Sequence, residues 1–348
     1  MTAASIAIVG PGRMGVGIAT AVLMANQGYT VTLIDTKKRE PGKETGALDS
    51  AREEVQANLE LLDGLDMLRG DAATLSKALG VSPALEQTIA GCSFVFEALP
   101  EKVTIKQDFY RAIGPLMDKD TVIASATSTF QLDVFWQVCT RPGNVVSAHW
   151  LNPAFLIPLV EVSHGEKTHG WASVRMCDFF RRIGKIPVNM KTSPGFIVPR
   201  IQAAAMNEAI RILQEGVTTA EEIDTAIKAG FGFRLAVMGL IEFVDLGGVD
   251  ILFHAGEYLH NKLGGDQFKP PQRVREKMAK EEMGPRTGKG FYDYNAVDTR
   301  KLFNEKYMGF AELLHLYERS KYLNFAGGIA IDAPSEIDAT PAKRKEKL

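Results

Sequence analysis

The chain has little of what builds disulfide or metal frameworks. It contains only three cysteines, Cys92, Cys139 and Cys177, and six histidines among 348 residues. An odd number of widely spaced cysteines argues against a secreted protein built on disulfides, and the scattered cysteines and histidines argue against a zinc framework. We therefore expect no bound metal and a reducing, cytoplasmic compartment.

Long apolar runs and a strong charge of one sign are also absent. No stretch reaches the roughly 20 apolar residues that a membrane-spanning helix needs, and the first residues do not have the pattern of a signal peptide. The formal net charge is only −2, so the chain has no basic field that would hold nucleic acid or an anionic membrane. We expect neither as a partner.

Strand-like and helix-like segments alternate through the first half of the chain. Short apolar or β-branched strands are expected at residues 6–9, 30–34, 94–98, 122–124 and 145–149, with helical patterns between them, the first at residues 14–26. This alternation predicts an α/β fold, with a Rossmann-type doubly wound parallel sheet covered by helices on both faces.

The length and the later segments predict more than one domain. Residues 1–192 form the expected Rossmann-like domain, with a helical insertion at about residues 40–80 that projects as a flap. Ser193-Pro194-Gly195 marks a break, after which residues 193–295 read almost entirely as helices and form an all-α domain. Residues 296–348 carry one more amphipathic helix and a flexible tail, whose Lys-rich end spans residues 343–347.

The sharpest local signal is the motif Gly10-Pro11-Gly12-Arg13-Met14-Gly15, between the first strand and the first helix. Its glycines permit a tight turn, a close approach to a pyrophosphate and close packing of helix on strand. Asp35 ends the second strand, where a carboxylate accepts hydrogen bonds from ribose hydroxyls and repels a 2′-phosphate. The pattern predicts NAD as the cofactor, whereas the cations Lys37, Lys38 and Arg39 keep NADP open as a minority alternative.

A second cluster combines His149 with Glu161 and a run of hydroxyls at residues 125–129. His149 ends an expected parallel strand, which is where open α/β sheets bind ligands, and its imidazole can move a proton near neutral pH. Glu161 could accept a hydrogen bond from the second ring nitrogen and stabilise the imidazolium. A purely structural His–Glu pair is the alternative, but the dinucleotide motif and the hydroxyls favour catalysis.

Several motifs in the same order carry a family resemblance over nearly the whole chain except the tail. They are GPGRMG at residues 10–15, FVFEALPEKVTIK at 94–106, SATST at 125–129, HWLNP at 149–153, PLVEV at 158–162, SPGFIV at 193–198 and TGKGFY at 287–292. With these motifs the chain resembles the L-3-hydroxyacyl-CoA dehydrogenase family.

The resemblance implies roles for individual residues. His149 would be the general base, Glu161 would orient it, and Ser128 would contact both the substrate oxygen and the cofactor. The implied cofactor contacts are Gly10, Gly12, Arg13, Met14, Gly15, Asp35, Glu101, Lys106, Ser128, Asn152 and Arg286, the last standing where a Lys is common. Ser128 and Asn152 would also bind substrate, and the helical domain would close over the cleft and form a homodimer.

Two departures from the family pattern leave the substrate open. Pro199 stands where the family usually has an Asn that donates to the substrate carbonyl, and proline has no such donor. Residues 56–63 contain no cation where the family is usually Lys-rich near the CoA phosphates. Relatives that act on free hydroxy acids, such as gulonate or carnitine dehydrogenases, share the catalytic pair, and Arg234 could bind such a substrate's carboxylate.

The sequence therefore predicts an NAD-dependent dehydrogenase that interconverts a 3-hydroxyacyl-CoA, or a closely related 3-hydroxy acid, and its 3-keto product. The alternative is a dehydrogenase of a free hydroxy acid with a carboxylate-binding Arg. A β-hydroxyacid dehydrogenase ranks lower because residues 198–214 contain no Lys, which that family uses there. A non-catalytic, crystallin-like dinucleotide-binding protein also ranks lower because His149 and Glu161 are present.

Overall fold

The structure is a computed structural model that describes residues 4–37, 40, 45–320, 322–323 and 325. It divides into two compact units, residues 1–205 and 206–348, which are treated separately below. The boundary falls inside the helix α8 (Val198–Gln214). The predicted cations Lys38 and Arg39 and the Lys-rich end at residues 343–347 lie outside the described residues.

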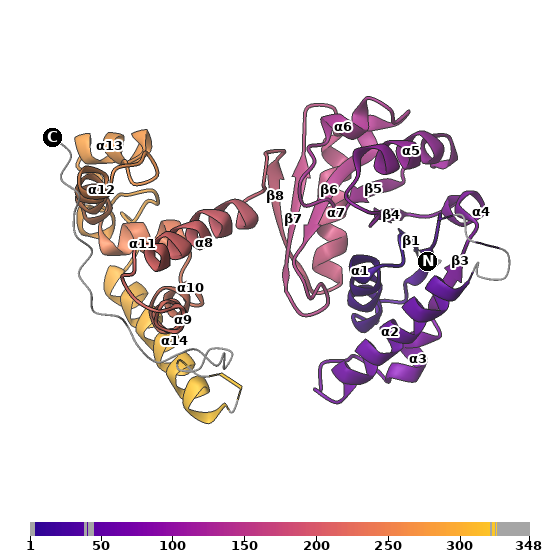
Figure 1. Ribbon diagram of the computed structural model, residues 1–348, viewed down its shortest axis with the longest axis horizontal. Helices are drawn as coiled ribbons and strands as arrows, with labels where there is room; N and C mark the ends of the chain where they lie inside the picture. Colours follow the sequence, from indigo (N-terminus) through magenta and orange to yellow (C-terminus); the bar gives the residue numbers. More distant parts are fainter. Residues whose placement is uncertain (1–3, 38–39, 41–44, 321, 324, 326–348) are drawn as a thin grey trace. The chain divides into compact units, whose positions relative to one another are not determined.

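An eight-stranded sheet forms the centre of the first unit, in the order β3-β2-β1-β4-β5-β6-β7-β8 (Figure 1). Its strands are β1 (Ser5–Val9), β2 (Thr30–Ile34), β3 (Leu79–Ser82), β4 (Phe94–Glu97), β5 (Val122–Ser125), β6 (Val145–Trp150), β7 (Leu159–His164) and β8 (Ile186–Lys191). Every neighbouring pair is parallel except β6 and β7, which are antiparallel. The predicted doubly wound sheet is confirmed.

Helices bury both faces of this sheet. Successive side chains of each strand point to opposite faces, and both faces are apolar. Ile6 and Ile8 of β1 belong to one core cluster, to which α1 (Arg13–Met24), α2 (Gly46–Asp63), α3 (Ala72–Ser76) and α7 (Gly170–Arg182) contribute. Ala7 and Val9 face the opposite cluster, to which α4 (Leu85–Ile89), α5 (Val103–Ile113) and α6 (Asp133–Trp136) contribute. This packing fixes the strand ends that carry the polar motifs.

The segment expected as a projecting helical flap contains α2 and α3, and both helices pack with α1 in one core cluster. The apolar side of α2 is fully buried, with Leu48, Val55 and Leu59 each 0% exposed in the same cluster as α1. α2 and α3 lead from β2 into β3, which pairs with β2 in parallel. They are the crossover that a parallel strand pair requires. The four residues of β3, Leu-Gly-Val-Ser, carry too little apolar or β-branched pattern to mark a strand.

The described residues of the second unit are almost entirely helical, as predicted. Its helices are the later part of α8, then α9 (Ala220–Ala226), α10 (Phe233–Leu235), α11 (Leu240–Gly247), α12 (Val249–Leu263), α13 (Gln272–Ala279) and α14 (Thr299–Arg319). A π-helical segment at Ile227–Gly232 joins α9 to α10. None of the helices in the described part of the chain is long and apolar enough to cross a membrane.

Candidate active site

His149 and Glu161 form a buried pair across two neighbouring strands. They are register partners of the antiparallel strands β6 and β7, so their side chains lie on the same face of the sheet. Nδ1 of His149 lies 2.8 Å from Oε2 of Glu161, and both residues are at most 4% exposed. A carboxylate acceptor at Nδ1 favours the tautomer that carries its proton there, which leaves Nε2 as the proton acceptor.

The remaining contacts of the pair hold it in place. The second oxygen of Glu161, Oε1, accepts hydrogen bonds from the backbone N–H groups of Ile197 and Val198 at 2.8 and 3.0 Å. Burial would raise the pKa of Glu161, but these bonds and the bond from His149 hold it below its ordinary value. The ring of His149 stacks on that of Phe196, with centroids 4.7 Å apart. The imidazole is therefore fixed on one face by an aromatic ring and at Nδ1 by a carboxylate.

The glycine motif forms a turn in which two positions, Gly10 and Gly15, can be occupied only by glycine. Gly10 has a positive φ of 111°, and a Cβ there would lie 2.4 Å from the carbonyl oxygen of Ala98. A Cβ at Gly15 would lie 1.9 Å from the carbonyl oxygen of Gly10, so helix and strand are as close as the motif predicts.

The same turn leaves room for an anion at the start of α1. A Cβ at Gly12 would meet no described atom within 4 Å, and no described side chain caps the helix there. Backbone N–H groups at such a helix start point at bound phosphates. Asp35, which follows β2, is 7% exposed and accepts a hydrogen bond from the backbone N–H of Lys37. These residues fit a dinucleotide: an open N-terminus for the pyrophosphate and a carboxylate for the ribose.

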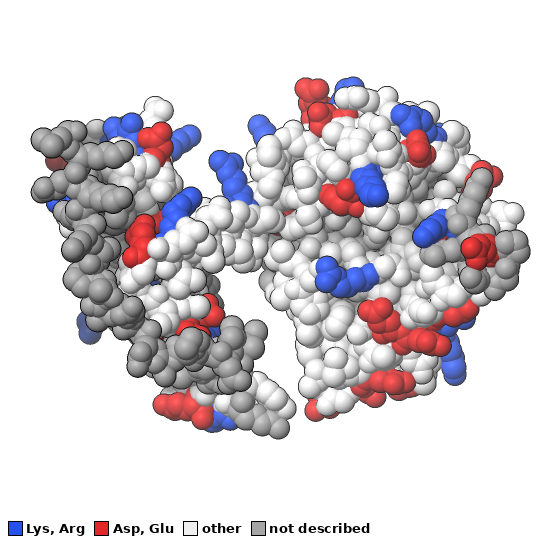
Figure 2. All heavy atoms as spheres, in the orientation of Figure 1, with Lys and Arg blue, Asp and Glu red and all other residues white. Residues whose placement is uncertain are grey.

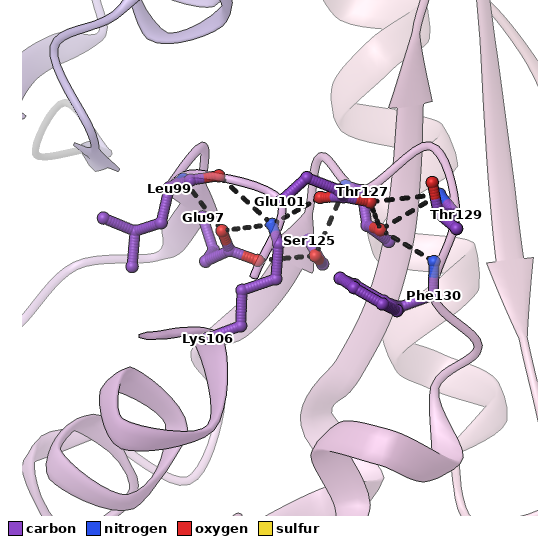
Figure 3. A network of polar contacts seen from close by, with 8 residues as sticks. All are labelled: Glu97, Leu99, Glu101, Lys106, Ser125, Thr127, Thr129 and Phe130. Carbon is purple, nitrogen blue, oxygen red and sulfur yellow. Dashed lines mark hydrogen bonds and ion pairs between the residues drawn. The ribbon is translucent and has the colours of Figure 1, made fainter. Parts of the chain in front are cut away.

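A network of charged and hydroxyl side chains joins the ends of β4 and β5 (Figure 3). Lys106 of α5 contacts both Glu97 and Glu101, at 2.7 and 3.2 Å. Glu101 in turn binds the hydroxyl of Thr127 and, at 3.1 Å, the backbone N–H of Thr129. The structure therefore brings the predicted residues Glu101 and Lys106 together, beside the turn that carries the exposed Ser128.

Asn152 lies in the first unit and is exposed, just beyond the end of β6. The two predicted arginines belong to the second unit. Arg286 is ion-paired with Asp250 of α12. Arg234 places its guanidinium 5.3 Å from the ring centroid of Phe243, and no carboxylate pairs with it in the described part of the chain.

An apolar cavity in the second unit includes Arg234 in its wall. Its volume is about 380 Å³, and half of its lining residues are aromatic side chains from α10, α11 and α14. The other cation in the wall, Lys306, is already paired with Glu242 at 2.6 Å. Arg234 is therefore the cation of this cavity that has no described carboxylate partner.

The surface of α2 carries an excess of acidic side chains. The exposed acidic residues of this helix are Asp49, Glu53, Glu54, Glu60 and Asp63, against the single exposed cation Arg52. Figure 2 shows several red patches on the first unit where α2 runs. This surface suits a polyanion such as the phosphates of CoA poorly.

Two buried charges near these motifs were not predicted from the sequence. Glu97 is 0% exposed at the end of β4, inside an apolar run that gave no sign of a functional carboxylate. Lys185 is 7% exposed and donates to the backbone carbonyls of Ala154, Phe155 and Ile157 at 2.7, 3.1 and 2.8 Å. Burial lowers the pKa of Lys185 to about 8. Its three bonds hold the segment that follows Asn152.

Two family models together match most of the chain. The NAD-binding domain of 3-hydroxyacyl-CoA dehydrogenase matches residues 5–193, and the C-terminal domain of the same enzyme matches residues 195–294. The whole of α14 and the residues after it lie beyond the second match.

Individual relatives agree with these matches. A 5-formyl-3-hydroxy-2-methylpyridine 4-carboxylate 5-dehydrogenase from Mesorhizobium japonicum is 31% identical over 303 residues, covering 87% of this chain and 94% of its own. A probable 3-hydroxybutyryl-CoA dehydrogenase from Deinococcus radiodurans is 28% identical, covering 82% and 99%. The crystal structure of a 3-hydroxyacyl-CoA dehydrogenase from Archaeoglobus fulgidus is similar with a TM-score of 0.73 and 27% identity, covering 91% and 100%.

Proposed function

Because the chain belongs to the 3-hydroxyacyl-CoA dehydrogenase family, a family with an NAD-binding domain, we propose that it oxidises a 3-hydroxy compound to its 3-keto product and catalyses the reverse reduction. The observation that carries the proposal is the buried pair of His149 and Glu161, with Nδ1 and Oε2 2.8 Å apart at the end of β6. The ends of parallel strands are where open α/β sheets place their reacting ligands.

His149 is the general base of the proposed reaction. Its Nε2 takes the proton of the substrate hydroxyl, while Glu161 keeps the imidazole in the required tautomer and stabilises the imidazolium that forms. Ser128 donates a hydrogen bond to the substrate oxygen from the neighbouring strand end. Bound NAD would supply the hydride acceptor for this oxidation.

The residues that would hold NAD follow from the fit described above. The open N-terminus of α1, with Gly10, Gly12, Arg13, Met14 and Gly15, would bind the pyrophosphate, and Asp35 would bind the adenosine ribose. The proposed contacts near the nicotinamide are Glu101, Ser128, Asn152 and Arg286. Lys37 is the one described member of the three cations that kept NADP open, and its backbone N–H, not its ammonium, donates to Asp35.

For the substrate, we propose a hydroxy compound with a free carboxylate. Three observations support it: the acidic surface of α2, Pro199 at the position of the family's usual Asn, and Arg234 in an aromatic cavity without a described carboxylate partner. The Mesorhizobium relative is named for a substrate with a carboxylate. The family's own name favours the second candidate, a 3-hydroxyacyl-CoA.

A substrate screen separates the two candidates. NADH formation is followed with 3-hydroxybutyryl-CoA and with free aliphatic and aromatic hydroxy acids, using the wild type, Arg234→Ala and His149→Ala. We expect turnover of at least one free acid, with a KM that rises strongly in Arg234→Ala. Efficient turnover of the thioester with no turnover of any acid would contradict the free-acid proposal. Turnover that His149→Ala leaves intact would contradict the proposed base.

A further inference from the structure

The backbone of Lys185 is fixed on both sides, between α7 and β8. Helix α7 ends with Gly184 in the left-handed region, at a φ of 78°, and the N–H of Lys185 donates to the carbonyl oxygen of Phe180 at 2.9 Å. The next residue, Ile186, opens β8, and its N–H donates to the carbonyl oxygen of Pro158 at 2.8 Å. The lysine side chain therefore starts from a rigid base.

The ammonium of Lys185 reaches from this base to a turn beyond the end of β6. A lysine ammonium has three hydrogens, and here they have three acceptors. Nζ lies 2.7, 3.1 and 2.8 Å from the backbone carbonyl oxygens of Ala154, Phe155 and Ile157. The ring centroid of Trp150, the last residue of β6, lies 5.9 Å from the same Nζ. Lys185 thus contacts both the strand end and the turn that follows it.

The bound segment, residues 153–157, is a tight turn with hydrogen bonds of its own. The N–H groups of Leu156 and Ile157 both donate to the carbonyl oxygen of Pro153, at 3.0 and 2.9 Å. Asn152, which we propose as a contact near the nicotinamide, comes directly before this turn and is exposed. The position of the turn therefore decides where the amide group of Asn152 lies.

Helix α1 is the second support of this turn. Ala154 is only 1% exposed, and a Cβ at Gly17 of α1 would lie 3.1 Å from the Cβ of Ala154. Helix and turn are therefore in close contact, and the start of the same helix is the proposed pyrophosphate site. The turn is held between the proposed cofactor helix and Lys185.

The charge of Lys185 is not needed to fill this space. A methionine has a side chain of similar length, and it would avoid the unfavourable burial of an ammonium, which lowers the pKa of Lys185 to about 8. It would, however, leave three carbonyl oxygens without their donor. The ammonium therefore stabilises one particular conformation of the turn rather than the packing around it.

We propose that Lys185 is a positioning residue, whose ammonium holds the turn at residues 153–157 and, through it, Asn152 in the place where the nicotinamide binds. Lys185 acts through the turn, and Asn152 makes the contact. The proposal rests on the function proposed above for Asn152, but the hydrogen bonds of the turn can be measured without any ligand.

The first test is amide hydrogen exchange of the cofactor-free protein at Leu156 and Ile157, the two amides that close the turn. Lys185→Met should exchange about tenfold faster at both, because the closed turn loses its donors. Lys191→Met is the matched control, since Lys191 is exposed at the other end of β8, and it should leave the exchange unchanged. Unchanged exchange in Lys185→Met would overturn the proposal. If that variant does not fold, Lys185→Gln, which keeps two donors without the charge, gives the same comparison.

The second test is a double-mutant cycle between Lys185 and Asn152, read in NADH affinity and in kcat/KM. Misplacing a group that contacts the cofactor should lower kcat/KM by about 10- to 100-fold in Lys185→Met. If Lys185 acts through Asn152, adding Asn152→Ala to Lys185→Met should cause little further loss. Losses that multiply would show independent effects and overturn the proposal. So would a lower melting temperature with unchanged kcat/KM and NADH affinity, which is the result expected of a lysine that only stabilises the fold.

The two tests also separate this proposal from the proposed function. If no hydroxy compound is turned over, the proposed function fails, while the exchange rates and the cycle in NADH affinity still decide whether Lys185 positions Asn152. If turnover is found but the exchange at Leu156 and Ile157 does not respond to Lys185→Met, the proposed function stands and the positioning role fails.

Discussion

Single residues in the first unit connect strands to the turns that follow them. Glu161 illustrates this best, because its two oxygens bind different parts of the chain: Oε2 binds His149, and Oε1 binds the backbone at Ile197 and Val198. One carboxylate thereby orients the proposed base and fixes the backbone at the start of α8. Removing it should affect both stability and activity.

Glu161→Gln should lower stability at neutral pH. The amide keeps the shape but loses the charge that strengthens three hydrogen bonds, so we expect a loss of about 1–3 kcal/mol in the free energy of unfolding. The folded state lowers the pKa of Glu161 below its ordinary value of 4.5, so the stabilisation is present above that pH and is lost as the pH falls through the folded pKa. Urea unfolding at pH 7 and at several acidic pH values should show the difference between wild type and variant narrowing. A difference in the free energy of unfolding that does not change with pH would contradict the assignment of a charged Glu161.

His149→Ala should fold and bind NADH but lose turnover by about 10²–10⁴-fold, the usual contribution of a general acid–base. His164→Ala is the matched control, because His164 ends the neighbouring strand β7 and, among the described residues, its ring bonds to the side chain of Asn189. Steady-state rates of both variants, with NADH titrations, give the comparison. Rates for His149→Ala within a few-fold of wild type would remove this residue from the mechanism.

Individual residues also show what a sequence can and cannot reveal. The pairing of His149 with Glu161 could be predicted because strand-end placement and residue type are local signals. The roles of Glu97 and Lys185 could not, because buried charges are rare and depend on acceptors that the fold brings from distant positions. The three carbonyls that bind Lys185 lie 28 to 31 residues away in the chain.

At the scale of elements, the turn between β1 and α1 contains glycines with different reasons for being there. Gly15 has no room for a Cβ because the carbonyl oxygen of Gly10 would lie 1.9 Å away, whereas a Cβ at Gly12 would meet open space. Gly15 is therefore required by the fold, whereas Gly12 leaves space that a bound phosphate can use.

Alanine substitutions at these two glycines should therefore separate folding from binding. Gly15→Ala should lower the melting temperature because backbone atoms must move apart. Gly12→Ala should melt near the wild-type temperature but bind NADH more weakly, since its methyl group projects where the pyrophosphate is expected. Thermal melts and NADH titrations check both. Equal NADH affinity of Gly12→Ala and wild type would place the phosphates elsewhere.

The elements that were predicted well are those with a strong local period. The strand at Thr30–Ile34 has the expected bounds, because β-branched residues mark it. β3 was missed, since a short strand at the sheet edge gives little signal without its neighbour β2. The place of β3 in the order β3-β2-β1 becomes clear only from its pairing with β2 in the structure.

At the scale of the whole molecule, the chain leaves a row of apolar side chains uncovered on α8. Met206, Ile210 and Leu213 are 62%, 54% and 39% exposed, at spacings of four and three residues, which places them on one face of this helix. Large apolar side chains in one stripe are typical of a surface that another molecule covers. The family resemblance implies a homodimer through the helical domain.

We accordingly expect a homodimer in solution that depends on this stripe. Met206→Glu combined with Ile210→Glu would place two charges on an apolar interface, where an unpaired buried charge is strongly unfavourable. The variant should become monomeric in sedimentation or light-scattering measurements while keeping its helical circular dichroism. The control is Met308→Glu together with Tyr307→Glu on α14, where exposed apolar side chains lie outside the matched family domain. A dimer that survives the α8 changes but dissociates with the α14 changes would assign the interface to the C-terminal helix instead.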